Sequence, residues 1–311
     1  MSFTQDVKLE ITHSNPERKC CQLAELAGFI RFAGSVTISG GKLGLKVTTD
    51  SPAAARKFIT LAKSYFGAKT ALSMGEPVAL GKGKSYVLNI TPEMNSEQIL
   101  REVGILGVRE GSNYITDGLS QDIIKKRCCK KAALRGIFMA AGSISDPKRS
   151  YHLELSCASN YMAKDVAKLI NSFGLKAKIS QRKDKFIVYI KDGDQILDFI
   201  STLGANNAYF QYQEVRITKE MRNHANRAQN CVMANLDKTA NAASRHLQAI
   251  DKIEQTKGLG VLPDKLYEAA VKRKENPELS LGELAELFDP PLKKSGLNHR
   301  LAKIVEFAER L

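Results

Sequence analysis

The chain has 311 residues and a formal net charge of +14, from 47 Lys and Arg against 33 Asp and Glu. With 43% apolar and 26% charged residues, its composition excludes fibrous and disordered proteins and fits a globular chain of about two domains. The excess of basic residues favours a polyanionic partner, either nucleic acid or an anionic membrane surface. No apolar run approaches the roughly eighteen residues of a membrane span, so we expect no transmembrane helix.

The first residues lack the basic and apolar regions of a signal peptide, so we expect a cytoplasmic protein. Its six cysteines are then expected as free thiols rather than as a disulfide framework. No Cys-x-x-Cys motif occurs, and the pairs Cys20-Cys21 and Cys128-Cys129 cannot both face one metal from the start of a helix. We expect these pairs to pack structurally, with a metal or redox role as the minor alternative, and we expect no cofactor.

Taken in chain order, residues 1–18 form a short helix or an extended lead-in that ends at Asn15-Pro16. Alternating apolar residues on either side of Gly40-Gly41 predict a hairpin of strands 36–39 and 43–48. The other elements expected before residue 110 are a helix at 20–33, a helix from Pro52 to Gly67, a strand at 86–90 and a helix from Ser96.

The helix at 20–33 is repeated 108 positions later without a gap, since Cys20-Cys21 is matched by Cys128-Cys129 and Gly28 by Gly136. Such repetition indicates an internal duplication. Small residues leave one face of each helix nearly bare, so the two helices are expected to pair closely around a local pseudo-twofold axis. Gly34 and Gly142 follow the two helices, where we expect left-handed residues at the helix ends.

The second copy keeps the element order of the first. We expect a strand at 151–155, a helix at 162–173, a hairpin of strands 176–180 and 185–190, and a last helix around 195–197. Each copy is therefore predicted as αββαββα. Residues 214–217 are expected as a last short strand or linker, followed by a long helix at 226–257 that stops at Gly258.

After Gly258 we expect only helices. Pro263-Asp264 begins one, and Ser280 begins another with Glu283 placed for a capping box. Asp289-Pro290-Pro291 is expected to end that helix, and Ser295 is expected to cap a final helix. A short helix, a tight turn and a longer helix are the helix-turn-helix arrangement.

The repeated helices resemble the LAGLIDADG motif of homing endonucleases, and the order of segments over essentially the whole chain is similar to the WhiA family. The WhiA resemblance includes Tyr151-His152-Leu153-Glu154, Arg222-Asn223, Asn226-Arg227, Ala234-Asn235, Lys238-Thr239 and the run Asp289 to Gly296. It implies an α+β fold with two LAGLIDADG-like αββαββα repeats, 1–110 and 111–221, and an all-α helix-turn-helix domain, 222–311. It also implies a bacterial DNA-binding regulator with roles in sporulation, transcription, cell division and chromosome segregation.

In the endonucleases that the motif resembles, an acidic residue at the foot of each helix holds the metal ions that activate water. Those positions are Ala33 and Ala141 here, and the acidic sixth position is Arg31 and Met139. We therefore predict that the nuclease metal site is lost and that the protein is not an enzyme. Asp146 is the nearest acid in the second copy, and we expect it to begin a turn with Pro147.

Other enzymatic interpretations are weaker. The five histidines share no metal-ligand spacing. Gly81-Lys82-Gly83-Lys84-Ser85 superficially resembles a phosphate loop but lacks its spacing, and a hairpin turn explains it better.

Three clusters are candidates for contact with double-stranded DNA. Asn and Arg at the start of a recognition helix suit adenine and guanine edges, while lysines hold phosphates. The first cluster lies at the turn and the leading turns of the final helix, and the alternative is a merely solvated helix face. It consists of Lys293, Lys294, Ser295, Asn298, His299, Arg300 and Lys303.

The second cluster is the hairpin with Lys178, Arg182 and Lys183, where basic side chains either follow the DNA backbone or protect an edge strand. The third surrounds Arg222 and Arg227, where basic residues and asparagines either contact phosphates or, as we slightly favour, form buried hydrogen bonds between domains. The leading hypothesis is a nucleoid-associated DNA-binding regulator with a catalytically inactive scaffold. A working nuclease and a scaffold for other regulatory or division proteins, with DNA binding confined to the C-terminal domain, are the alternatives.

Overall fold

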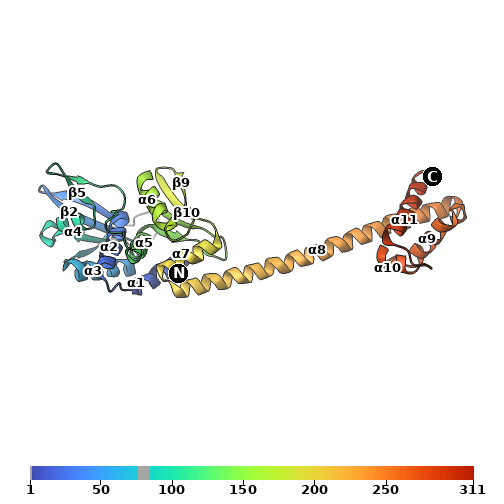
Figure 1. Ribbon diagram of the computed structural model, residues 1–311, viewed down its shortest axis with the longest axis horizontal. Coiled ribbons are helices and arrows are strands. Elements are labelled where there is room, and N and C mark those ends of the chain that lie inside the picture. Colours follow the sequence, from blue (N-terminus) through green and yellow to red (C-terminus); the bar gives the residue numbers. More distant parts are fainter. Residues whose placement is uncertain (1, 76–84) are drawn as a thin grey trace. The chain divides into compact units, whose positions relative to one another are not determined.

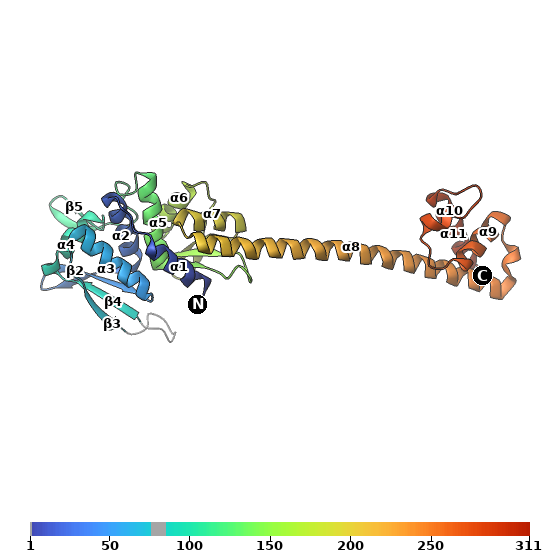
Figure 2. The same cartoon turned by 90° about the horizontal axis from the view of Figure 1, so that it is seen from below.

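A computed structural model describes residues 2–75 and 85–311, and Figures 1 and 2 show its ribbon from two sides. The chain divides into two compact units, Met1–Thr218 and Lys219–Leu311. Gly81-Lys82-Gly83-Lys84 lies outside the described residues, so its hairpin turn stays a prediction. No helix in the described ranges is both long enough and apolar enough to cross a bilayer.

The first unit contains two copies of the predicted αββαββα order. The first copy consists of α2 (Lys19–Ala33), β1 (Gly34–Ser39), β2 (Lys42–Thr49), α3 (Pro52–Phe66), β3 (Ala71–Gly75), β4 (Ser85–Ile90) and α4 (Ser96–Glu102). The second consists of α5 (Arg127–Ala141), β7 (Gly142–Ile144), β8 (Leu153–Cys157), α6 (Asn160–Asn171), β9 (Lys178–Arg182), β10 (Lys185–Ile190) and α7 (Gly193–Leu203). The antiparallel sheets have equivalent strand orders, β1-β2-β4-β3 and β7-β8-β10-β9.

Helices α2 and α5 lie side by side between the two sheets in both views (Figures 1 and 2). A Cβ atom added to Gly28 would lie 2.4 Å from the Ala133 carbonyl oxygen, and one added to Gly136 would lie 2.1 Å from the Glu25 carbonyl oxygen. Positions 25 and 133 are themselves equivalent in the repeat, so the two close approaches are reciprocal. The close pairing of the bare helix faces around a pseudo-twofold axis is therefore confirmed.

Gly34 and Gly142 end these helices for a different reason from the one expected. Their φ angles are −94° and −84°, so neither residue is left-handed, and the expectation was wrong. Each glycine instead turns the chain directly into a strand against its own helix. A Cβ atom on Gly142 would lie 2.2 Å from the Phe138 ring, and one on Gly34 would lie 2.4 Å from the Ile30 carbonyl oxygen.

The link between the copies contains a small hairpin that sequence patterns did not indicate. Strands β5 (Leu106–Arg109) and β6 (Ser112–Ile115) pair across a turn at Glu110 and Gly111, which both have positive φ. Most of its side chains are exposed, so its sequence lacks the apolar alternation of a half-buried strand. The Arg31 guanidinium fastens the link by donating to the carbonyls of Thr116, at 2.6 Å, and Gly104, at 2.7 Å.

One continuous apolar core joins both repeats with the N-terminal helix α1 (Phe3–His13). Within it, fully buried Glu25 on α2 forms ion pairs with Lys57 on α3, at 3.8 Å, and with Arg135 on α5, at 3.6 Å. Lys57 also donates to the Asn15 side-chain oxygen at 2.8 Å. This charged cluster therefore joins both repeats and the segment after α1 inside the unit.

Helix α8 (Asn206–Lys257) begins earlier than expected. The strand or linker expected at 214–217 is helical, because Ala208 and Tyr212, four residues apart, both face the core of the first unit. Gly258 ends the helix at φ 76°, as expected. The second unit adds α9 (Asp264–Glu275), α10 (Leu281–Glu286) and α11 (Lys294–Glu309), which pack with the end of α8 around a separate apolar core.

Candidate nucleic-acid interface

The beginning of α10 is fixed by a capping signal that the sequence contains. Ser280 and Glu283 form the expected capping box, with the Glu283 carboxylate accepting from the Ser280 backbone N–H at 2.9 Å. Before it, buried Arg273 donates to the Asn276 carbonyl at 3.2 Å and to the Leu279 carbonyl at 2.7 Å. Arg273 thereby holds the loop that leads into α10, and sequence patterns did not single it out.

Helix α11 presents one buried and one exposed face. Leu297, Leu301 and Ile304 pack into the core of the second unit. The other face carries the exposed members of the first expected cluster, Lys293, Lys294, Ser295, Asn298, His299 and Lys303. The prediction that Ser295 caps α11 was wrong. Helix α11 already begins at Lys294, and Lys293 occupies the capping position.

A shallow hollow lies at the start of this helix, lined by Leu281, Lys294, Ser295 and Asn298, with a volume of about 580 Å³. It joins the beginning of α10 to the beginning of α11. The backbone N–H groups at a helix start favour anions, and the polar side chains beside them can donate to a base or a phosphate. The side chains around the hollow can therefore bind a phosphate and contact a base edge at the same time.

Arg300 differs from the rest of its cluster. Its guanidinium lies 5.5 Å from the centre of the Phe288 ring and 3.6 Å from the Glu268 carboxylate, and the residue is half-buried. These contacts connect α11 to α9 and to the turn. Arg300 therefore has a structural role in packing α11, and its substitution would disturb that packing as well as remove a charge.

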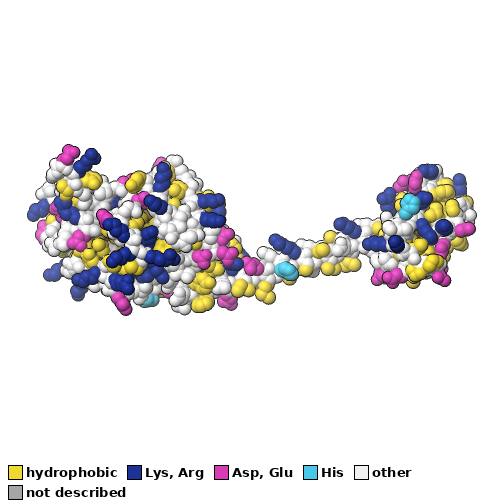
Figure 3. Space-filling view, viewed as in Figure 1, with side chains coloured by type: hydrophobic (Ala, Val, Ile, Leu, Met, Phe, Trp, Pro, Cys, Tyr) yellow, Lys and Arg dark blue, Asp and Glu magenta, His cyan; other side chains and the backbone are white. Residues whose placement is uncertain are grey.

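The second cluster lies on a hairpin, as expected. Strand β9 is an edge strand with every residue exposed, and it pairs with β10 in a register that places Lys185 opposite Arg182. Lys178 and Arg182, four residues apart on one strand, share a face of the sheet. Lys183 occupies the turn with φ 53°. On the face that Figure 3 draws, Lys and Arg side chains occur on both units.

The third cluster belongs to α8. Arg222, Asn223, Asn226, Arg227 and Asn230 are all exposed in the helix. The buried hydrogen bonds between domains that the sequence slightly favoured for them stay a prediction. An exposed asparagine contributes little to helix stability, so a helical face with several of them is free to serve contacts outside the chain.

The positions that hold metal in the endonucleases are the last residues of the paired helices, Ala33 in α2 and Ala141 in α5. Their methyl groups offer no ligand atom. Arg31, at the other motif position, is occupied with the link between the repeats. Asp146 begins a turn as expected, because its carboxylate accepts from the Lys148 N–H at 2.9 Å.

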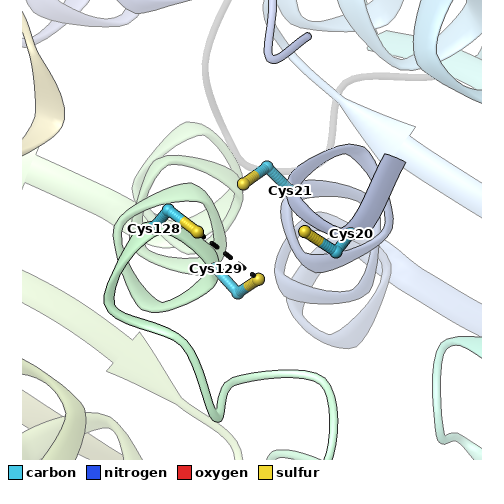
Figure 4. A group of neighbouring side chains, drawn as sticks. All are labelled: Cys20, Cys21, Cys128 and Cys129. Carbon is cyan, nitrogen blue, oxygen red and sulfur yellow. Dashed lines mark hydrogen bonds between the residues drawn. The ribbon is translucent and has the colours of Figure 1, made fainter. Parts of the chain in front are cut away.

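The structure contradicts the expectation that the vicinal cysteines cannot share a site. The sulfur atoms of Cys20, Cys21, Cys128 and Cys129 all lie within 4.8 Å of one another between the starts of α2 and α5 (Figure 4). One helix start by itself spreads its two cysteines apart, whereas the paired helices bring two starts together. The 108-residue repetition of the cysteine pairs, combined with the predicted helix pairing, was the signal that could have revealed this site.

Three models of the WhiA family match most of the chain. They are the WhiA N-terminal LAGLIDADG-like domain at 19–106, the WhiA LAGLIDADG-like domain at 130–222 and the WhiA C-terminal HTH domain at 225–308. A probable cell division protein WhiA of Alkaliphilus metalliredigens is 40% identical over 311 residues, covering 100% of this chain and 98% of that protein. The corresponding protein of Clostridium perfringens strain 13 is 42% identical with the same coverage.

Solved structures share the fold. A crystal structure of full-length DUF199/WhiA from Thermatoga maritima superposes with a TM-score of 0.61 at 24% identity, covering 100% of this chain and 99% of that one. A crystal structure of an N-terminal LAGLIDADG domain of DUF199/WhiA has a TM-score of 0.51 at 20% identity, covering 65% of this chain and 90% of that one. At these identities the likeness concerns the fold alone.

Proposed function

The chain belongs to the WhiA family, and from this premise we propose that it is a sequence-specific DNA-binding protein that regulates transcription. We propose further that it acts in bacterial cell division, chromosome segregation and sporulation. Its relatives are described as probable cell division proteins. Its location would follow from its DNA partner, in the cytoplasm at the nucleoid.

One observation carries the proposal: the first turns of α11 expose six polar or basic residues, while the opposite face is anchored in an apolar core. A recognition helix needs this division, because its reading face must enter a groove while its other face fixes its angle. The shallow hollow at Lys294 and Asn298 adds a place where a phosphate and a base edge can be contacted together.

A salt titration of DNA binding tests the assignment. The double variant K294A/K303A of the full chain should bind duplex DNA more weakly and reduce the salt slope by about 0.9 for each phosphate that the missing lysines no longer neutralise. N298A removes no charge, so it should leave the slope unchanged and reduce discrimination between sequences. K257A, which changes an exposed lysine at the end of α8, serves as the charge control. An unchanged affinity and slope in K294A/K303A would remove the reading role from α11.

We propose that the first unit is a non-catalytic scaffold and that its domains are 1–110 and 111–221, followed by 222–311. The basic hairpin at Lys178, Arg182 and Lys183 would follow the DNA backbone, and Arg222 and Arg227 on α8 would add phosphate contacts. All five side chains are exposed, which supports this role.

A scaffold for other regulatory or division proteins is the second candidate. It is favoured by apolar side chains exposed on the first sheet, Ile38 at 74%, Met74 at 74% and Leu72 at 53%. Leu72 and Met74, two residues apart, share one face of the edge strand β3, and adjacent exposed apolar side chains are typical of protein contacts rather than of phosphate contacts. In this case DNA binding would be confined to the C-terminal domain.

A further inference from the structure

Four cysteines meet where the two central helices begin. Cys20 and Cys21 lie in the first turn of α2, and Cys128 and Cys129 lie in the first turn of α5. Their sulfur atoms face a shared space between the helices (Figure 4). Each sulfur lies within 4.8 Å of the other three, and those of Cys128 and Cys129 are 4.0 Å apart.

The convergence follows from the pseudo-twofold pairing. Adjacent side chains on one helix point in directions about 100° apart, so a single Cys-Cys pair spreads around its helix. The partner helix presents the same spread from the opposite side. Cys21 then faces Cys128, and Cys20 faces Cys129, so that two diverging pairs enclose one point.

The dimensions fit a single ion. Metal–sulfur bonds of about 2.3 Å in a tetrahedral site place the four sulfurs about 3.8 Å from one another. The observed separations of up to 4.8 Å reach this value through small side-chain rotations. An iron–sulfur cluster would place further iron and sulfide atoms between the ligands and would need wider separations than these.

The surroundings suit a negatively charged centre. Four thiolates around a divalent cation leave a net charge of −2, which needs compensation. Two helix N-termini converge on the cysteines, and Arg18 and Lys126 occupy the capping positions of α2 and α5. Arg18 also lies beside Cys128 across the helix pair. Cys21 and Cys129 are buried, whereas Cys20 and Cys128 are half-buried, which leaves an entry path for the ion.

We propose that Cys20, Cys21, Cys128 and Cys129 bind one zinc-type divalent ion in a closed structural site. The ligand set consists of soft thiolates alone, which selects zinc over magnesium or calcium. No open coordination position remains, so the ion supplies no catalysis. It links the start of α2 to the start of α5 and thereby fastens the two repeats at their common axis.

The metal content of the full chain tests this site directly. Protein purified under reducing, oxygen-free conditions should contain close to one Zn²⁺ per chain by elemental mass spectrometry, or take up one equivalent from added Zn²⁺. Replacing the bound Zn²⁺ with Co²⁺ should produce the visible absorption bands of a tetrahedral tetrathiolate centre. The variant C20S/C128S should lose most of the bound metal, whereas C157S/C231S, which changes one buried and one exposed cysteine elsewhere, should retain it.

Three outcomes would overturn the proposal. The first is wild-type protein that neither contains Zn²⁺ nor takes it up. The second is metal that stays bound in C20S/C128S or is lost from C157S/C231S. The third is intact-mass data showing that these cysteines form disulfides under the same reducing conditions. The Co²⁺ spectrum uses wild-type protein, so it tests the tetrathiolate site independently of whether the serine variants fold.

Discussion

At the scale of single residues, Glu25 is the side chain whose chemistry depends most on its surroundings. It is a fully buried residue of α2, and burial raises the pKa of its carboxyl to about 7, although Lys57 and Arg135 pull that pKa down. In the unfolded chain the carboxyl ionises near its ordinary 4.5. At pH values between these two pKa values, the folded protein therefore keeps a proton on Glu25 that the unfolded chain has released.

The free energy of unfolding should depend on pH for this reason. The free energy of unfolding should fall by up to about 3 kcal/mol as the pH rises from about 4.5 to about 7. Above that pH it should no longer change for this reason. Glu25→Gln cannot ionise, so its stability should lack this slope in urea unfolding at a series of pH values. The control is Glu97→Gln, which changes an exposed carboxyl in an ion pair with Arg101. A difference between wild type and Glu25→Gln that is constant with pH would contradict the buried-proton explanation.

At the scale of elements, the hairpin β9–β10 can serve two purposes. Its lysines and arginine either contact the DNA backbone or keep an edge strand from pairing with another chain. The strand order leaves β9 at the edge of its sheet with every residue exposed, which is compatible with both purposes.

The variant K178A/R182A separates them. If the hairpin follows the backbone, the salt slope of DNA binding should fall by up to about 1.8, the value for two phosphate contacts. The matched control is K164A/K168A, which removes two exposed lysines from α6 in the same unit. An unchanged slope with increased self-association would instead assign the basic residues to edge protection and favour the scaffold alternative.

At the scale of the whole molecule, the duplication means that DNA cleavage would need residues from both repeats. The nuclease metal centre needs an acid from the foot of each helix, and both positions are alanine. We therefore expect supercoiled plasmid to stay uncut in the presence of Mg²⁺ or Mn²⁺, as followed by gel electrophoresis. Cleavage that persists through purification and stops with a chelator would show that other residues had taken over the missing ligands.

Patterns in the chain predict the features that depend on neighbouring residues or on repetition. The 108-residue repeat, the element order αββαββα, the capping box at Ser280 and the end of α8 at Gly258 were all predictable, because each depends on a short pattern. The helix-turn-helix was also predictable from local patterns, and the family resemblance supported it. Strands β3 and β7 had no predicted ranges of their own and entered the order only through the repeat, and the hairpin β5–β6 was not predicted, because such short strands show little apolar alternation.

Which distant side chains meet depends on how the elements pack in three dimensions. That packing turned Arg300 toward Phe288 and Glu268 instead of leaving it fully exposed with its cluster. It also placed Glu25 of α2 between cations from two other helices, α3 and α5, and brought four cysteines from two helix starts around one point. Such contacts depend on the angle and distance at which helices pack. For Glu25 and the cysteines, that geometry follows from the close approach of α2 and α5 at Gly28 and Gly136, and the small residues on the two helices predict the pairing but not which other side chains it brings together.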